Sequence, residues 1–272
     1  MPTPKAVTLD NKYLAVLLNR IEVCKNYKPK FGKGGTEGLT LEEFTELYQA
    51  DTFYSWFGLD HPLLYAAHKA AGGITSVYRQ IGTGCEQVFR LMLQDQLGLT
   101  ETQAKWSYEA TSSGKNRILS LDGRIELKDI ESPEKRKVVS RWLQEAATYL
   151  KIAPEIAKVL KGAVFEVRQG YKSKDSKRQN ADIANAANAY SQGYLPVVVV
   201  LSTQIDRDIA SRYEIEKWLI LQGHIGGSSL TSTYIFAKEI VGYDLAHFFQ
   251  SNSAALKKAI DAVLKVLLGA DH

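Results

Sequence analysis

The chain has 272 residues, long enough for one large domain or for a core with a helical extension, because single cores stop growing at roughly 250 to 300 residues. Its hydrophobic content of 45% and charged content of 24% exclude a collagenous or disordered class. A formal net charge of +4 permits a nucleic-acid partner without requiring one. The two cysteines, Cys24 and Cys85, are too few for a disulfide framework and favour a reducing, cytoplasmic setting.

No segment of the sequence is typical of a membrane or secreted protein. The N-terminus lacks the cleavage pattern of a signal peptide, and no apolar run approaches the ~20 residues that span a bilayer. The most hydrophobic stretch, LPVVVVLS at 195–202, is short and rich in β-branched residues, which predicts a strand buried on both faces. We therefore expect no membrane partner.

The first 70 residues are predicted to form a helical N-terminal extension. Thr40 is a candidate N-cap for LEEFTELYQA, and Pro62 opens the next helix. Between them lies a Lys- and Gly-rich stretch, KNYKPKFGKGG, at residues 25–35. This stretch is either a solvated, flexible connection, as such compositions more often are, or a basic arm that contacts phosphate.

Residues 71–272 are predicted to form an α/β core with C-terminal helices, in one compact unit with the extension. GCEQVFRLMLQDQLGL has apolar residues at helical spacing, which predicts a helix from Gly84 that ends near Gly98. Glu86 would lie near its N-terminus, where the helix dipole favours a carboxylate, so capping is its more ordinary role. Asp122 and Gly123 either make a tight turn between two strands or close the end of one.

The second half of the sequence alternates helices and strands. Pro133 and Pro154 each open a helix, with Trp142 on the apolar face of the first, alongside Val138, Ala146 and Tyr149 or Leu150. The strand AVFEV follows Gly162, then an Ala-rich helix ends at Gly193 and leads into the buried strand. A strand, helix and strand in this order require a crossover, so the two strands should be parallel neighbours. With a final helix at 253–268, the sequence predicts a mixed α/β fold, in which a small sheet is wrapped by helices.

The strand after Gly162 carries the residues best suited to chemistry. Residues two apart on a strand point to the same face, so Glu166 and Arg168 should project together, while Phe165 and Val167 face the other way. If the strand that Asp122 ends is adjacent, it brings a second carboxylate to the same edge. Two carboxylates and a cation beside a phosphate are the minimal apparatus for metal-assisted phosphodiester hydrolysis, in which the carboxylates hold Mg²⁺.

A competing triplet, Glu126–Leu127–Lys128, has the same order of carboxylate, any residue and lysine. On one extended strand Glu126 would lie about 13 Å beyond Asp122, at ~3.3 Å per residue, which is too far to share one ion. Only a tight turn at Gly123 would bring it closer. Because Asp129 and Glu131 follow it, we expect Glu126 to be a solvated strand end.

A burst of positive charge follows the strand and leads into the predicted Ala-rich helix. Cations are slightly unfavourable at a helix N-terminus, whereas an anion is welcome there. The burst is either a solvated charge run or a group that holds DNA by its backbone, and its position next to Glu166 favours DNA. Its members are Lys172, Lys174, Lys177 and Arg178.

Other catalytic templates are missing from the sequence. The five histidines do not occur at HExxH spacing, which argues against a zinc hydrolase. The sequence contains no GxxxxGK[ST] loop and no GxSxG elbow. The glycine-rich GHIGGSS at 223–229 lacks the context of a dinucleotide-binding motif and is predicted to form a loop, which could approach DNA closely.

These residues resemble the PD-(D/E)xK nucleases, and within them the type II restriction endonucleases of the ApaLI-like family. The resemblance rests on SLDGRI, on FEVRQGYKSKDSKRQNADI and on the upstream AGGITSVYRQIGTGCEQVFR, and it covers roughly residues 71 to 250. It implies a restriction-endonuclease-like core, a mixed β-sheet flanked by helices, with helical N-terminal and C-terminal additions. The superfamily motif is short and degenerate. The resemblance therefore implies membership of the PD-(D/E)xK superfamily first, and of the ApaLI-like family within it second.

The resemblance assigns roles to individual residues. Asp122 and Glu166 match the metal-binding carboxylates, and Arg168 stands where the usual pattern has lysine. Arginine keeps its proton and holds phosphate as a planar fork, so either it acts electrostatically alone, or Lys172 or Lys174 replaces the lysine, or the nuclease is weakened. Glu86 resembles an acidic residue that assists through a second metal or a water.

The resemblance also implies partners. It implies a homodimer that encircles a short palindromic duplex of DNA and uses Mg²⁺, each subunit cutting one strand. Base contacts would come from polar side chains such as Asn180, Asn185 and Asn188. The alternatives are a DNA-binding protein of the same fold that has lost cleavage, and a repair nuclease that recognises branched or damaged DNA by shape.

Overall fold

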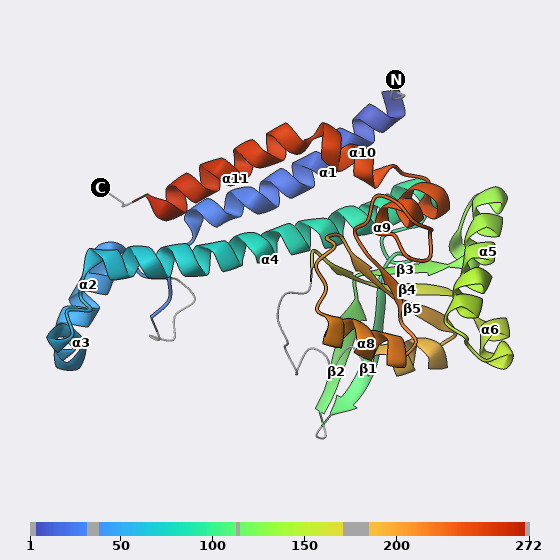
Figure 1. Ribbon diagram of the computed structural model, residues 1–272, viewed down its shortest axis with the longest axis horizontal. Helices are drawn as coiled ribbons and strands as arrows, with labels where there is room; N and C mark the ends of the chain where they lie inside the picture. Colours follow the sequence, from blue (N-terminus) through green and yellow to red (C-terminus); the bar gives the residue numbers. More distant parts are fainter. Residues whose placement is uncertain (1–3, 32–37, 113–114, 171–184, 270–272) are drawn as a thin grey trace. The chain divides into compact units, whose positions relative to one another are not determined.

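The computed structural model in Figure 1 describes residues 4–31, 38–112, 115–170 and 185–269. These residues form a mixed α/β structure, as the sequence predicts, with a four-stranded and a two-stranded sheet accompanied by helices. Two compact units are present: one comprises Met1–Gly84 and Ser251–His272, and the other comprises Cys85–Gln250. This division differs from the predicted boundary at residue 70 and from the predicted attachment of the last helix to the core.

A continuous helix explains why no boundary falls at residue 70. Helix α4 runs without interruption from Pro62 to Leu97, beginning at the predicted proline. It ends before Gly98, as predicted, and the φ of +74° at Gly98 is a conformation that glycine adopts readily. Glu86 therefore lies inside a long helix, and the predicted capping role is wrong.

The first unit is helical and contains both ends of the chain. Its elements are α1 (Pro4–Glu22), η1 (Val23–Asn26), α2 (Leu41–Gln49), α3 (Thr52–Trp56), the first part of α4, and α11 (Ser253–Leu268). Apolar side chains from α1, η1, α4 and α11 form one buried cluster, which explains why the C-terminal helix belongs with the N-terminal ones. The cluster consists of Ile21, Cys24, Val77, Val263 and Leu267.

The N-cap predicted for α2 is present. Thr40 caps the helix in a reciprocal box: its Oγ1 accepts from Glu43 N at 3.2 Å, and its own N donates to Glu43 Oε2 at 2.7 Å.

The described part of the basic stretch is held by an aromatic residue. Phe31 packs in an aromatic cluster with ring centroids 4.7 to 6.5 Å away. Residues 27–31 are therefore anchored to the helices, while 32–35 lie outside the described residues. The partners of Phe31 are Phe44, Tyr48, Tyr65 and His68.

The second unit contains both sheets. Its strands are β1 (Trp106–Ser112), β2 (Lys115–Leu121), β3 (Gly123–Glu126), β4 (Gly162–Arg168), β5 (Tyr194–Val200) and β6 (Leu219–Leu221). Its helices are the end of α4, η2 (Leu127–Asp129), α5 (Pro133–Tyr149), α6 (Pro154–Val159), a helix at 185–191, α8 (Arg207–Ile215), α9 (Thr233–Ile235), the π-helix η3 (Phe236–Val241) and α10 (Leu245–Ser251). In the described part of the chain, no helix is long and apolar enough to cross a membrane.

The four-stranded sheet has the order β3-β4-β5-β6. Strand β3 is antiparallel to β4, whereas β4, β5 and β6 are parallel, so the predicted crossover between β4 and β5 is confirmed. Asp122 lies directly after the end of β2 and directly before β3, and these strands belong to different sheets, so no hairpin forms there. The alternative in which Asp122 closes a strand is the one observed.

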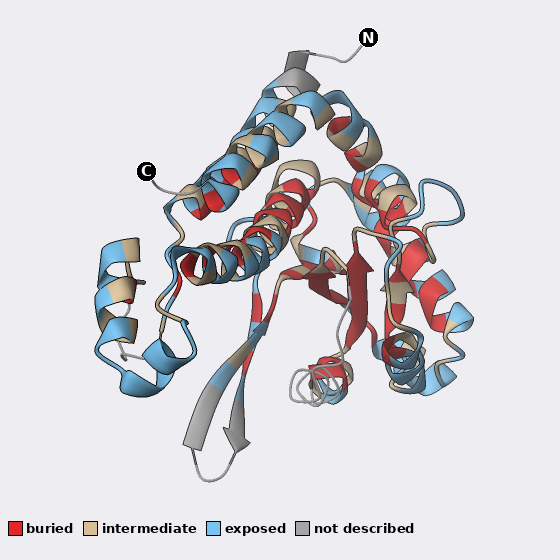
Figure 2. Ribbon diagram, turned by 60° about the vertical axis from the view of Figure 1, so that its left-hand side comes forward, coloured by how far each residue is buried: buried red, intermediate tan, exposed pale blue. Residues whose placement is uncertain are grey.

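Both faces of β4 and β5 are covered, as Figure 2 shows for the sheet. On one face, Val164 and Val198 pack in a cluster with Trp106, Tyr194 and Trp218. On the other face, alternate residues of β4 meet a set of aromatic rings, because a strand turns successive side chains to opposite sides. Phe165 packs there against Phe89 and Phe236, with ring centroids 5.2 and 5.7 Å apart.

Helix α5 packs against β4 and η3 (Figure 1), but its buried face differs from the predicted one. Ser132 and Pro133 begin the helix as expected, and Trp142 is buried. Val138 and Tyr149, predicted to share that face, are exposed. The buried stripe is instead Val139, Trp142, Leu143, Ala146 and Ala147. This spacing gives helix α5 a wider apolar stripe.

Replacing Phe165 by alanine should test this core without touching the charged side chains on the other face of β4. The ring is fully buried, so we expect the free energy of unfolding to fall by about 3 to 5 kcal/mol. Urea denaturation measures the change. Ile118→Ala is the matched control, because Ile118 on β2 is 75% exposed and its loss should cost under about 0.5 kcal/mol. Equal losses in both variants would contradict the described core.

Candidate functional site

Arg168 stands at the C-terminal end of β4 and is surrounded by three carboxylates. Its Nη1 lies 3.8 Å from Oδ2 of Asp122 and 4.0 Å from Oε1 of Glu86, and its Nη2 pairs with Oε1 of Glu166. The side chains of Arg168 and Glu166 are only 14% and 7% exposed. We name these four residues the Arg168 cluster. Four of the five residues predicted to be catalytic therefore lie together, all within the second unit.

Strand geometry places the two carboxylates predicted to bind metal. Glu166 and Arg168 share a face of β4 because they are two residues apart. The antiparallel register pairs Gly123 with Phe165, which brings the preceding Asp122 beside the end of β4. Asp122 Oδ2 accepts a hydrogen bond from Val167 N at 2.8 Å, so its side chain is tied to the backbone of β4.

Helix α4 supplies the third carboxylate and an arginine that the sequence interpretation missed. Arg90 Nε donates to the backbone oxygen of Asp122 at 2.8 Å. Glu86 and Arg90 are four residues apart and therefore lie on the same face of the helix. That spacing is visible in the sequence, but its meaning depends on knowing that α4 passes Asp122. Arg90 acts as a positioning residue for the turn between β2 and β3.

The Arg168 cluster gathers several charges in a sheltered place. Charges taken out of water are costly unless they are paired and hydrogen-bonded. Each of the three carboxylates pairs with the guanidinium of Arg168, and Arg90 brings a second guanidinium beside Asp122.

The donor atoms of the cluster suit a hard divalent cation, since Mg²⁺ prefers carboxylate and water oxygens. In the described part of the chain, however, no group of three or more His, Cys, Asp or Glu residues is placed to hold a metal ion. The carboxylates converge on Arg168 instead. The carboxylate oxygens are therefore the right type of ligand for magnesium. In this structure they contact the guanidinium of Arg168, which occupies the place where an ion would bind them.

Of the predicted DNA contacts, Asn185 is buried, and its Oδ1 accepts from Tyr108 Oη at 2.7 Å, so it does not present a free edge to DNA. Five others lie outside the described residues. Lys172, Lys174, Lys177, Arg178 and Asn180 all belong to the segment 171–184. This segment directly follows Gly170, just beyond the Arg168 cluster. The end of β4 is held up to that point, because Leu201 N donates to Arg168 O at 2.8 Å and Ser202 N donates to Gln169 O at 2.9 Å.

The glycine-rich segment at 223–229 is a loop, as predicted, and it follows the C-terminal end of β6. Trp142 Nε1 donates to Ser229 O at 3.0 Å, which fixes the loop to α5. Behind the loop, Thr233 Oγ1 donates to Val200 O at 2.8 Å and Tyr234 Oη donates to Leu201 O at 2.9 Å. The loop and the Arg168 cluster therefore share the edge at which the parallel strands end, where ligands bind in open α/β sheets.

Glu126 is not the solvated strand end that the sequence suggested. The residue is 5% exposed, and its Oε2 accepts from Tyr194 Oη at 2.6 Å. Lys128 Nζ lies 2.9 Å from its Oε1, and Arg124 Nη1 lies 3.6 Å from its Oε2. The prediction weighed only neighbours in sequence, whereas Tyr194 reaches Glu126 across the sheet. This carboxylate is fully partnered and structural.

The two cysteines are buried free thiols, as expected. Burial raises the pKa of Cys85 to about 12, helped by the nearby negative charge of Glu86. A thiol acts as a nucleophile only as thiolate, and a group with so high a pKa stays protonated at neutral pH. Cys85 therefore does not act as a nucleophile beside the Arg168 cluster.

Comparison with protein-family models, with curated proteins and with solved structures finds no match to this chain. We therefore infer function from the Arg168 cluster itself.

The free energy of unfolding of Glu126→Gln, measured over a series of pH values, should show how much the ionised Glu126 stabilises the fold. Burial raises the pKa of Glu126, but the Tyr194 hydrogen bond and the charge of Lys128 lower it more, so it lies below its ordinary value. A lowered pKa stabilises the fold above the unfolded pKa, and the effect is lost as the pH falls through the folded pKa. At neutral pH the variant should lose about 1 kcal/mol of unfolding free energy, and the loss should shrink below about pH 4.

Urea unfolding at each pH measures this difference. Glu155→Gln serves as a control because Glu155 is exposed, and it should track the wild type at every pH. A loss in Glu126→Gln that stays constant from neutral to acid pH would contradict the assignment.

Removing the guanidinium at the centre of the cluster should be costly. Arg168→Met keeps much of the aliphatic chain but leaves three carboxylates facing one another, so we expect a loss of about 3 to 5 kcal/mol in unfolding free energy. The exposed Arg141 on α5 gives the matched control, Arg141→Met, which should change stability by under about 0.5 kcal/mol. Equal stability of the two variants in urea would show that the ion pairs of Arg168 do not form.

Proposed function

We propose that this protein is a type II restriction endonuclease of the PD-(D/E)xK superfamily, which hydrolyses phosphodiester bonds in double-stranded DNA with Mg²⁺. One observation carries the proposal: Asp122, Glu166 and Arg168 meet at the C-terminal end of a buried strand. These are the residues that match the nuclease motif in sequence. Elements separated by some 40 residues in the sequence bring them together, as a shared metal site requires.

Asp122 and Glu166 would hold the magnesium ion. When bound, the metal lowers the pKa of a coordinated water and neutralises charge that develops on the phosphate. The carboxylate oxygens of these two residues are of the kind that Mg²⁺ prefers as ligands, which supports the binding of a divalent cation there. Asp122 is held ready for this role, because its hydrogen bond from Val167 fixes the carboxylate against β4.

Arg168 would turn its planar fork toward the scissile phosphate. Its guanidinium stabilises negative charge through paired hydrogen bonds, but it does not release a proton. Lys172 or Lys174 would then supply the cation that the family pattern places two residues after the glutamate. Glu86 would hold Arg168 away from the metal ligands, or assist through a water.

The rest of the proposal follows from the resemblance. The core would be restriction-endonuclease-like, and two copies of the chain would enclose a palindromic site, each cutting one strand. Lys172, Lys174, Lys177 and Arg178 would hold the phosphate backbone. Asn180 would contact the DNA beside them.

A second candidate is a DNA-binding protein of the same fold with weakened or lost cleavage. The observation that favours it is the ion pair between Arg168 and Glu166, which engages one of the two metal ligands. In the usual pattern the cation at this place is a lysine, which binds as a compact point charge. A guanidinium that stays on Glu166 would keep the metal out.

Cleavage of a long unmethylated phage DNA distinguishes the two candidates. With Mg²⁺ the wild type should give discrete bands, and EDTA should abolish them. Glu166→Gln and Asp122→Asn should each slow cleavage by at least about a hundredfold, because each removes a metal ligand. Glu155→Gln removes an exposed carboxylate and should cut like the wild type. Uncut DNA that is still retarded on a gel would establish the second candidate.

Magnesium binding can be measured without cleavage. Addition of Mg²⁺ in the absence of DNA should raise the thermal midpoint of the wild type and of Glu155→Gln, but not that of Glu166→Gln. Equal shifts in all three proteins would place the ion elsewhere and overturn the assignment of Glu166.

A further inference from the structure

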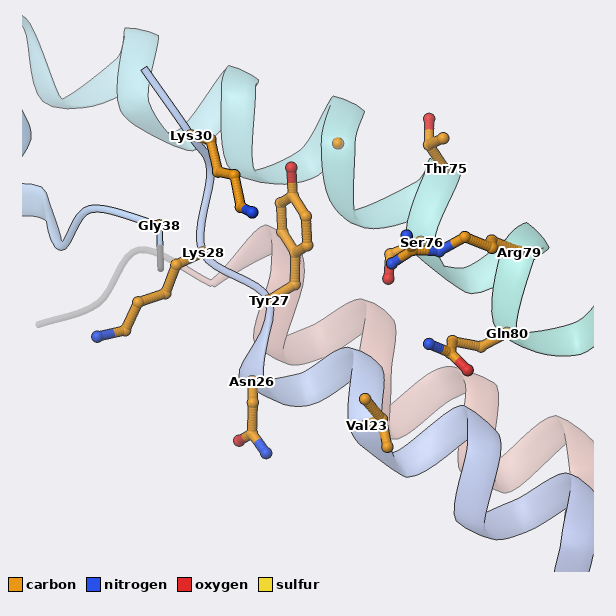
Figure 3. Close-up of a pocket in the computed structure, with 11 residues that line it drawn as sticks. Val23, Asn26, Tyr27, Lys28, Lys30, Gly38, Thr75, Ser76, Arg79 and Gln80 are labelled. Atoms are coloured by element: carbon orange, nitrogen blue, oxygen red, sulfur yellow. The ribbon is translucent and has the colours of Figure 1, made fainter. Parts of the chain in front are cut away.

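A cavity of about 930 Å³ lies in the first unit (Figure 3). One wall comes from the end of η1 and the basic segment after it, and the other comes from α4. The volume is that of a small-molecule site rather than of a packing defect. The described residues that line it include Lys28, Lys30 and Arg79, and none of them is acidic.

The three cations of this cavity have no carboxylate partner among the described residues. Their neighbour Lys25 behaves differently, because its Nζ pairs with Glu22 Oε1 at 2.5 Å. Figure 3 shows the amine of Lys30 and the guanidinium of Arg79 on opposite sides of the Tyr27 ring, while Lys28 points away from them. A concave surface lined by one sign of charge concentrates ions of the other sign.

The basic wall is built into the fold rather than suspended in solvent. Pro29 is buried, and its carbonyl accepts from Leu39 N at 2.9 Å, so the two ends of the loop are joined. Tyr27 stands against the helix: a Cβ added at Gly72 would meet its Oη at 1.9 Å. The close approach therefore requires glycine at this position. Together with the packing of Phe31 in its aromatic cluster, these contacts fix the backbone from which the side chains of Lys28 and Lys30 extend.

A neutral side chain in the same wall also calls for a ligand. The Oε1 atom of Gln80 is buried and has no hydrogen-bond partner among the described residues. Such an acceptor is satisfied by a donor, and a carboxamide also offers an N–H₂ to an anionic oxygen. Lys30 and Arg79 on either side of the Tyr27 ring, with the Gln80 carboxamide near Arg79, match a ligand with phosphate oxygens and hydrogen-bond donors.

We propose that this cavity binds a phosphate group, with Lys30 and Arg79 as its principal contacts and Gln80 beside them. The phosphate would come either from a free nucleotide or diphosphate or from a nucleic-acid backbone, since the binding chemistry is the same. The inference does not depend on the nuclease proposal, because the first unit contains none of the Arg168 cluster.

Two probes in EDTA, where cleavage does not occur, test this site. Calorimetry measures the affinity for inorganic pyrophosphate, and fluorescence anisotropy measures that for a short labelled DNA duplex. The variant Lys30→Gln with Arg79→Gln should bind at least one probe about tenfold or more weakly than the wild type. Lys257→Gln with Lys258→Gln removes the same charge from the exposed face of α11 and should bind like the wild type.

The pattern across probes identifies the source of the phosphate. Loss for pyrophosphate alone indicates a small phosphate-bearing ligand. Loss for the duplex, with the slope of log affinity against log salt reduced by about 2, indicates two backbone contacts. Exchanging the cations, Lys30→Arg with Arg79→Lys, keeps the charge and should restore most of the affinity.

Some results would overturn the proposal. Equal affinities of the wild type and the Lys30→Gln, Arg79→Gln variant for both probes would do so, as would failure of the wild type to bind either probe. Thermal melting of each variant establishes that it is folded. Glu166→Gln should bind pyrophosphate like the wild type, so failure of the nuclease proposal and failure of this one give different results.

Discussion

The ion pairs of Arg168 join three segments of the second unit at one point: α4, the β2–β3 junction and the end of β4. A charged residue at the end of a buried strand must be paired, because desolvation of an ion costs several kcal/mol. The position of Asp122, and with it the register of β3 on β4, is therefore coupled to the arginine. The same ion pairs that join these segments therefore also set the positions of Asp122 and Glu166.

Two buried glutamates in the same sheet have different partners. Glu126 and Glu166 are equally buried, at 5% exposure. Lys128 and Arg124 both contact Glu126, and Tyr194 donates a hydrogen bond to it. Glu166 instead pairs with Arg168, which two further carboxylates also approach. A fully satisfied polar network stabilises the fold, and the partners of Glu126 explain why we treat it as structural.

Local patterns were enough to predict several parts of this structure. The period of two along β4 placed Glu166 and Arg168 together, helix starts at Thr40 and Ser132 followed from capping chemistry, and the crossover made β4 and β5 parallel. Each of these depends on residues close in sequence or on a strong rule of chain topology.

What the sequence could not predict depends on distant neighbours. Glu126 was misplaced because Tyr194 lies 68 residues away. The sequence interpretation placed two helices, one opened by Pro62 and one from Gly84, where a single α4 runs through. Gly73 stays helical, and a Cβ added there would lie 2.5 Å from the Leu267 side chain. A helix accepts glycine when another element packs closely on it. The predicted phosphate contacts at 172–180 lie outside the described residues, so their role stays a prediction.

The packing of α1 with α11 has a consequence for biosynthesis. Domains generally fold as units during translation, the N-terminal one first. Here the cluster that closes the first unit needs Val263 and Leu267 of α11, which are synthesised after the whole of the sheet unit, Cys85–Gln250. Helix α1 therefore cannot bury its share of this cluster until α11 has been made. The first unit is begun before the sheet unit and completed after it.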